Sequence, residues 1–301
     1  SSVTNNGAWS TYIWTCDWEN TWTTANCSAT NSNVPIYDIA NSLRFNDDDS
    51  AYLSRTPSSA GDRKKWTWSW WVKRGNLWTT QAIFGTEPDS WNSQTVLEFN
   101  TDDTLWFTGE DGTDFAFKTT AKYRDPSSWL HIVVSVNTDV FWVRIYVNGL
   151  QITDFSSESQ PSLGFQTGWN DMYWHRIGTY SVPSDLFDGY LSNTHFIDGQ
   201  ALSSTSFGQF NGTTGQWEAK DYAWAYGTNW FELDFSNSSN LWEDVSTNTN
   251  NWTVTNIDST NQMIDSPTNN FATLNPLDKG SNIDLLEGNT KYDSTGVNTW
   301  V

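Results

Sequence analysis

The feature that most constrains the fold is an alternation of apolar and polar side chains in residues 129–152, WLHIVVSVNTDVFWVRIYVNGLQI. Apolar side chains at every second position of residues 130–136 indicate a β-strand with one face in the core. The alternation resumes at residues 143–147, so we expect a second strand that pairs antiparallel with the first. Asn148 and Gly149 tolerate a positive φ, which a tight turn into a third strand requires.

Shorter segments repeat this pattern. In residues 66–73, WTWSWWVK, three tryptophans and Val72 take alternate positions on one buried face of a strand, and Trp71 and Lys73 belong to the other face. Further short strands are expected at residues 42–45, 81–84, 95–99, 104–108, 115–118, 228–235 and 251–256. Loops rich in Asp, Asn, Gly and Pro separate them, which is typical of an antiparallel sandwich. One turn, at residues 203–207, could be helical with Ser203 as its cap.

The composition narrows the kinds of partner. The chain contains 21 tryptophans and is 16% aromatic, so rings must supply most of the core. With 35 acidic against 15 basic residues, the net charge of −20 would repel a phosphate backbone, which argues against nucleic acid as a partner. No apolar run approaches the roughly 18 residues of a membrane span, so we expect no membrane insertion.

Three segments carry a family resemblance. Residues 129–149, with Trp129, His131 and the run IYVNG, resemble the central hairpin of laminin-G-like domains, which belong to the concanavalin A-like jelly rolls. Residues 43–53 resemble the opening strand of that family, and residues 187–202 resemble its closing strand. The resemblance implies an all-β fold, an antiparallel jelly-roll β-sandwich with irregular N- and C-terminal extensions. The expected parts are a Trp- and Thr-rich arm at 1–40, the laminin-G-like domain at 41–235 and an Asn-, Ser- and Thr-rich extension at 236–301.

A narrower resemblance concerns the setting of the protein. Residues 52–74, 187–202 and 265–275 are similar to virion proteins of tailed phages from aquatic samples, which are tail-fibre-like. This resemblance implies a virion or extracellular location, other virion subunits as partners, a homo-oligomer that is trimeric as in fibres, and contact with host-surface carbohydrate. The chain starts at Ser1 and ends within a strand-like pattern, so we expect processing or a longer polypeptide that continues into another domain.

Aromatic side chains in polar loops are the candidates for glycan binding. Sugar rings stack their apolar faces on flat aromatic rings while polar side chains bind the hydroxyl groups. Five such residues lie in or beside loops rich in Asn, Asp and Gly: Trp78, Trp91, Trp169, Trp174 and Tyr180. Each of them alone could instead be a core ring or a subunit contact.

Oxygen-rich loops are the candidates for a cation. In calcium-binding relatives of the laminin-G and pentraxin kind, the ligands come from loops at one edge of the sheet, and four residues occupy comparable loops here: Glu87, Asp89, Asn92 and Asp185. The similarity is one of loop position and not of motif, so solvated acidic loops are the competing interpretation. The pattern requires no cofactor and allows Ca²⁺.

The chain has two cysteines, Cys16 and Cys27, which enclose a short Trp-rich loop. A disulfide between them would stabilise the fold by up to about 3 kcal/mol and would imply an oxidising environment. Two thiols that never meet are the alternative.

A search for catalytic residues favours a protein without enzymatic activity. Jelly-roll glucanases carry Glu-x-Asp-x-x-Glu on one strand, and the nearest match is residues 232–237, in which Asn237 replaces the third carboxylate. An amide cannot take part in the proton transfer that the reaction requires. The three histidines stand in strand-like segments without a nucleophile motif. Together with this result, the resemblance to phage proteins implies a non-enzymatic virion protein, a fibre or capsid-decorating component that contacts host-surface glycans or neighbouring virion subunits. A secreted glycan-active hydrolase and a purely architectural virion subunit are the alternatives.

Overall fold

The computed structural model describes residues 37–87, 94–109, 114–182, 184–223 and 227–294, together with the backbone of two strands near the N-terminus. Those strands, β1 (Thr11–Cys16) and β2 (Ala25–Thr30), form an antiparallel hairpin. Residues 1–37 form one compact unit and residues 38–301 a second. The arm that we expected to be irregular therefore contains regular structure.

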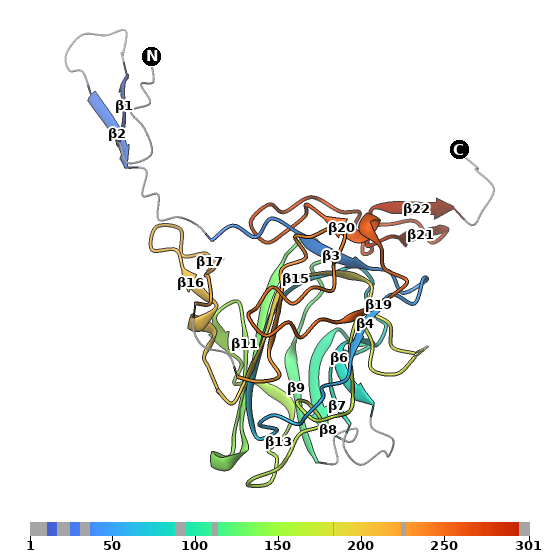
Figure 1. Ribbon diagram of the computed structural model, residues 1–301. Coiled ribbons are helices and arrows are strands. Elements are labelled where there is room, and N and C mark those ends of the chain that lie inside the picture. Colours follow the sequence, from blue (N-terminus) through green and yellow to red (C-terminus); the bar gives the residue numbers. More distant parts are fainter. Residues whose placement is uncertain are drawn as a thin grey trace. The chain divides into compact units, whose positions relative to one another are not determined.

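Two antiparallel sheets of eight strands each build the second unit (Figure 1). The first sheet has the order β12 (Leu150–Gln151), β11 (Trp142–Val147), β10 (Leu130–Asn137), β5 (Lys65–Arg74), β15 (Gly189–Asp198), β3 (Ser42–Phe45) and β20 (Gln262–Met263), and β18 (Phe231–Leu233) also pairs with β15. The second has the order β13 (Phe155–Ser159), β9 (Phe115–Lys122), β8 (Thr104–Gly109), β7 (Thr95–Phe99), β6 (Gln81–Glu87), β14 (Trp174–Ile177), β4 (Tyr52–Arg55) and β19 (Thr253–Thr255). This arrangement confirms the all-β, antiparallel jelly-roll sandwich.

Aromatic rings fill the space between the sheets. The tryptophans of β5 that alternate toward the core, Trp66, Trp68 and Trp70, are fully buried. The Trp68 and Trp70 rings stack with centroids 3.9 Å apart, and the Trp68 ring lies 4.3 Å from Phe84 of the opposite sheet. The prediction of a core built from rings is confirmed.

The outer face of the first sheet is buried as well, which the alternation does not predict. Trp71 and Lys73, which were expected on the wetter side of β5, are both buried. Later parts of the chain cover them. The hairpin of β16 (Gly208–Phe210) and β17 (Trp217–Ala219) brings the Trp217 indole against His131, which stacks on Trp71. Residues 265–271 cover Lys73, whose Nζ hydrogen-bonds to Asp265.

The C-terminal extension contributes strands to both sheets. β19 pairs with β4 at one edge of the second sheet, and β20 pairs with β3 at one edge of the first. A further hairpin, β21 (Ile283–Leu286) and β22 (Lys291–Ser294), follows. Part of residues 236–301 therefore belongs to the sandwich. The strands before residue 236 show enough alternation to predict the sandwich without this part.

The turns have the conformations that their residues favour. Asn148 and Gly149 join β11 to β12 with φ of 47° and 82°, as predicted. The 3₁₀ turn η4 (Ser204–Ser206) begins where the helical turn was expected. Ser203 is at the cap position, but its hydroxyl hydrogen-bonds to Thr205 Oγ1 instead of capping the backbone.

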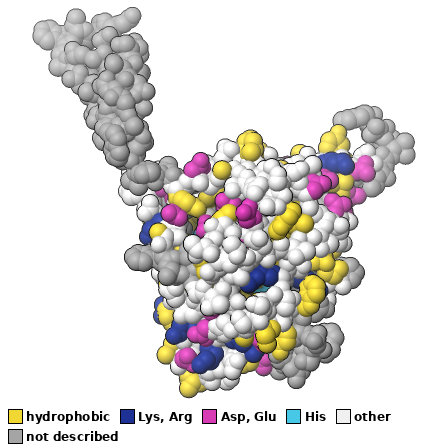
Figure 2. Space-filling view, viewed as in Figure 1, with side chains coloured by type: hydrophobic (Ala, Val, Ile, Leu, Met, Phe, Trp, Pro, Cys, Tyr) yellow, Lys and Arg dark blue, Asp and Glu magenta, His cyan; other side chains and the backbone are white. Residues whose placement is uncertain are grey.

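In the view of Figure 2, most of the surface is neither hydrophobic nor charged, which agrees with a chain rich in Asn, Ser and Thr.

Candidate functional site

The outer surface of the second sheet carries an exposed indole ring on β14. Side chains of a strand alternate between the two faces of a sheet, so His175 and Ile177 point into the core while Trp174 and Arg176 point outward. The Trp174 side chain is 54% exposed. A ring of this size that remains half in solvent on a regular strand is available for contact with another molecule.

Arg176 links Trp174 to two tyrosines. Its guanidinium carbon lies 5.6 Å from the ring centroid of Trp174 and 5.9 Å from that of Tyr52 on the neighbouring β4. Its Nη1 donates a hydrogen bond of 2.8 Å to the carbonyl oxygen of Tyr180. We call the surface formed by Tyr52, Trp174, Arg176 and Tyr180 the Trp174 face.

A glycine allows this arrangement. Gly85 of β6 pairs with Arg176, and a Cβ at Gly85 would lie 2.3 Å from the Cβ of Tyr180. Only a residue without a side chain leaves room for Tyr180 to lie against β6. Gly178, with φ of 93°, supplies the conformation with which the chain leaves β14 toward Tyr180.

The side chains of the Trp174 face suit recognition by stacking and hydrogen bonding. A flat indole accepts the apolar face of a sugar ring, and a guanidinium offers several fixed donors to hydroxyl or carboxylate groups. Cation–π contact with the two rings orients the guanidinium before a ligand arrives. The described side chains of the face include no carboxylate.

His175 supports the face from behind. The backbone N–H of Asn170 donates to His175 Nε2 at 2.9 Å, so the ring proton must reside on Nδ1, which donates to the carbonyl oxygen of Tyr173 at 2.9 Å. Burial is the main cause that lowers the pKa of His175 to about 4; the hydrogen bond to the Tyr173 backbone and the charge of Asp171 oppose this shift, and the charge of Arg55 adds to it. His175 is therefore neutral near pH 7 and holds the loop that precedes β14.

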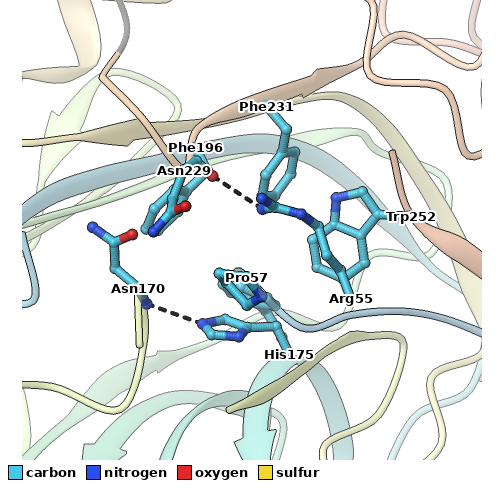
Figure 3. A pocket seen from close by; sticks show the side chains of 9 residues that line it. Arg55, Pro57, Asn170, His175, Phe196, Asn229, Phe231 and Trp252 are labelled. Carbon is cyan, nitrogen blue, oxygen red and sulfur yellow. Dashed lines mark hydrogen bonds between the residues drawn. The ribbon is translucent and has the colours of Figure 1, made fainter. Parts of the chain in front are cut away.

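A small cavity lies next to His175 (Figure 3). Arg55 enters it between Phe231 and Trp252 and donates to the carbonyl oxygen of Asn229 at 3.1 Å. Burial lowers the pKa of Arg55 to about 10. The cavity volume of about 10 Å³ is close to the minimum that one water molecule needs, so the cavity is too small for a sugar.

Comparison with known proteins places the fold. Residues 46–206, just over half of the chain, match the family model Laminin_G_3 of the concanavalin A-like lectin/glucanases superfamily. The chain belongs to this superfamily. No curated protein matched its sequence significantly.

Three solved structures are similar to the chain at low sequence identity. A candidate carbohydrate-binding protein from Bacteroides ovatus ATCC 8483 aligns with a TM-score of 0.51 and 16% identity over 82% of this chain and 69% of its own. The SAP-like pentraxin from Limulus polyphemus, a native heptamer, aligns with a TM-score of 0.40 and 15% identity over 55% of this chain and 79% of its own. Domains LG4-5 of the mouse laminin α1 chain align with a TM-score of 0.40 and 14% identity over 62% of this chain and 45% of theirs.

The five predicted glycan-binding residues of this superfamily member have different positions. Trp174 and Tyr180 come together on the Trp174 face. Trp78 is 50% exposed and lies apart from them, beside Asp103. Trp169 is fully buried, with its ring 4.8 Å from that of Trp66, so its assignment as a ligand contact is wrong. Trp91 lies outside the described residues.

Two of the four predicted calcium ligands, Glu87 and Asp185, have backbone positions that the structure describes. The backbone N–H of Ala82, near the start of β6, donates to the carbonyl oxygen of Asp185, whereas Glu87 is the last residue of that strand. Five residues of strand separate these positions by about 16 Å, so Glu87 and Asp185 cannot share one ion. Asp89 and Asn92 lie outside the described residues. Among the residues that are described, no group of three His, Cys, Asp or Glu side chains could hold a metal ion.

The two cysteines lie on the N-terminal hairpin, where Cys16 pairs with Ala25 and Cys27 with Trp14. They are diagonal rather than opposite in this register. Diagonal positions are about 7–8 Å apart, and disulfides usually join Cα atoms that are about 4.4–6.8 Å apart. Their side chains lie outside the described residues, so the disulfide stays a prediction.

Two residues of the Trp174 face, Tyr52 and Arg176, were not among the glycan-binding residues predicted from the sequence. Arg176 could have been found, because Trp174 and Arg176 are two positions apart on a short strand and must share a face. Tyr52 could not, since it reaches Arg176 through the pairing of β4 with β14.

No described helix is long and apolar enough to cross a membrane.

Proposed function

We propose that this protein is a non-enzymatic virion component of a tailed phage that binds host-surface glycans through the Trp174 face. The observation that carries this proposal is the half-exposed Trp174 indole beside the Arg176 guanidinium on the outside of a lectin-like sheet. The ring supplies a stacking surface and the guanidinium supplies donors at its edge.

The virion setting draws support from where the phage-like segments lie. Lys73, in the segment 52–74, donates hydrogen bonds to Asp265 and Asn270 in the segment 265–275. Two stretches that resemble phage proteins, and that are far apart in the sequence, thus contact each other through a buried lysine. Both segments therefore belong to one packed part of this protein. We further propose that the protein acts as a homo-oligomer, a trimer if it belongs to a fibre, which size-exclusion chromatography with light scattering would test.

The absence of an enzymatic role is part of the proposal. Glycosidases of the usual kind need two carboxyl groups about 5–9.5 Å apart on either side of the scissile bond. The four residues that define the Trp174 face are aromatic or cationic, and the register partner of Trp174 on β6 is a single acidic residue, Glu87. The competing function, glycan hydrolysis, predicts new reducing ends when the purified protein is incubated with the glycans that it binds.

A glycan array tests the proposal. The wild-type protein should bind a limited set of glycans, Trp174→Ala should lose them, and none should be cleaved. Tyr292→Ala is the matched control, because Tyr292 is an exposed aromatic residue on β22, outside the Trp174 face. Absence of binding to any glycan would favour a purely architectural role, and equal binding by both variants would contradict the assignment of binding to the Trp174 face. Mass spectrometry of purified particles should find the chain in the virion.

A further inference from the structure

An open groove lies away from the Trp174 face, between the end of β9 and the C-terminal extension. Residues from both sides line it, among them Lys122, Tyr123, Arg124, Leu130 and Leu277. Its volume of about 520 Å³ is in the range of sites that bind small molecules. One side of it is formed by Asn275 and Leu277, which follow the part of the chain that matches the superfamily.

The groove concentrates positive charge on an acidic protein. The net charge of the chain is −20, yet two basic side chains line this groove. Lys122 is exposed, and within the described part of the chain it forms no ion pair. Asp125, also in the groove, accepts hydrogen bonds from Ser127 and Ser128, which lower its pKa. Asp125 is therefore ionised, so the groove contains two positive side chains and one negative side chain, and Lys122 is exposed to solvent.

The Arg124 guanidinium is fixed through Nε, and in the part of the chain that the structure describes its terminal nitrogens are free to bind a ligand. Its Nε donates to Oδ2 of Asp103 at 2.8 Å, and its side chain remains 42% exposed. Neither terminal nitrogen of Arg124 has a hydrogen-bond partner among the described residues. Asp103 itself is fully buried and also binds Arg74. An arginine fixed through Nε presents its two terminal nitrogens in the geometry that binds a carboxylate or sulfate.

The same carboxylate binds the backbone of an exposed tryptophan. The backbone N–H of Trp78 donates to Oδ1 of Asp103 at 2.9 Å, and Trp78 adopts φ of 60°. A positive φ is unfavourable for a bulky residue, and strain of this kind is concentrated at binding sites. Asp103 therefore holds both the Trp78 backbone and the Arg124 guanidinium. Tyr123 adds an aromatic side chain to the lining of the groove.

We propose that this groove is a second binding site, one for an anionic oligosaccharide that carries carboxylate or sulfate groups. Lys122 and the terminal nitrogens of Arg124 bind the anion, and Tyr123 and Leu277 contact the sugar rings. The proposal relies on the proposed function only in that the ligand is a glycan. It does not require the Trp174 face, because none of the groove residues belongs to that face.

Isothermal titration calorimetry with three oligosaccharides of equal length tests the site: tetragalacturonate, a sulfated galactotetraose and neutral galactotetraose. At least one of the two anionic ligands should bind about tenfold more tightly than the neutral one, with an affinity that falls as NaCl rises from 50 to 500 mM. Preference for one of them identifies carboxylate or sulfate as the group recognised. Neutral galactotetraose that binds as well as both anionic ligands would overturn the proposal.

Charge reversal locates the site. Lys122→Glu should weaken binding of the anionic ligand about tenfold, whereas Lys220→Glu, an equal charge change at an exposed lysine outside the groove, should leave it unchanged. Trp174→Ala should also leave it unchanged, which separates this site from the proposed function. Equal losses in both lysine variants would show an effect of net charge alone and contradict the proposal. The proposal would also be contradicted if the wild-type protein bound no anionic glycan and Lys122→Glu abolished self-association. The groove would then bind an acidic segment of a second copy of the chain.

Discussion

Nζ of Lys73 lies 2.8 Å from Oδ2 of Asp265, and the two side chains are 0% and 9% exposed. The same nitrogen donates to Asn270 Oδ1 and to the carbonyl oxygen of Phe271, so all three of its protons are used. Asp265 in turn accepts a hydrogen bond from Trp129 Nε1 at 3.0 Å. This network fixes residues 265–271 on the outer face of β5.

The Lys73 network makes a prediction about stability. Lys73→Met leaves the buried Asp265 carboxylate without its counter-charge, so the free energy of unfolding should fall by about 3–5 kcal/mol. Chemical denaturation measures this change, and hydrogen exchange should show faster exchange in residues 264–271. Lys64→Met is the control, because Lys64 pairs with Asp139 at the exposed surface and its loss should have no measurable effect. Equal stability of both variants would contradict the role of the network.

Asp188 predicts a pH dependence of the opposite sign to the usual one for a carboxylate. Burial, and secondarily the charge of Asp47, raise the pKa of Asp188 to about 8. Between pH 4 and pH 8 the folded state therefore keeps a proton that the unfolded chain has lost, so the free energy of unfolding falls as pH rises through this window. Asp188→Asn removes this dependence. Its stability relative to the wild type should increase by up to about 1.4 kcal/mol per pH unit.

Thermal or chemical unfolding at pH 5, 6, 7 and 8 measures the Asp188 effect. The matched control is Asp221→Asn, the same substitution at an exposed position. A constant difference for Asp188→Asn would show that this carboxyl group ionises normally in the folded protein.

The buried histidines should resist protonation. Trp217 Nε1 donates to Nδ1 of His131 at 3.0 Å, so Nε2 carries the ring proton and donates to Ser69 Oγ at 2.8 Å. Burial lowers the pKa of His131 and of His195 to about 3. Stability from these residues is complete above about pH 6.5 and is lost as pH falls toward 3. Nitrogen NMR of the rings at pH 5 should show neutral tautomers, and midpoints near pH 6.5 would refute the packing.

Gly85 connects packing to binding. Gly85→Ala introduces a Cβ against Tyr180, which should cost about 1–3 kcal/mol of stability and shift the carbonyl that binds Arg176. We expect weaker glycan binding as a result. Gly212→Ala is the control, because nothing lies within 4 Å of a Cβ at that position. Unchanged affinity in Gly85→Ala, with stability lowered, would show that Tyr180 does not position Arg176.

Local patterns in the sequence predicted the sandwich well. Residues 42–45 and 95–99 form strands with the predicted boundaries, and the tryptophans of residues 66–70 face the core as their alternation requires. The burial of Lys73 and Trp71 was not predictable, because the residues that cover them lie far along the chain. The site was only partly predictable, because some of its residues come together through strands that are far apart in the sequence. Trp174 is identified by its own strand, whereas Tyr52 joins it only through sheet register.

The most direct test of the central claim is calorimetric titration of a glycan identified on the array against the wild-type protein and Trp174→Ala. Loss of the stacking surface should raise Kd about tenfold or more, which corresponds to about 1.4 kcal/mol, while the melting temperature stays the same because the ring is half exposed. An unchanged Kd in Trp174→Ala would contradict the assignment of glycan binding to the outer face of the second sheet.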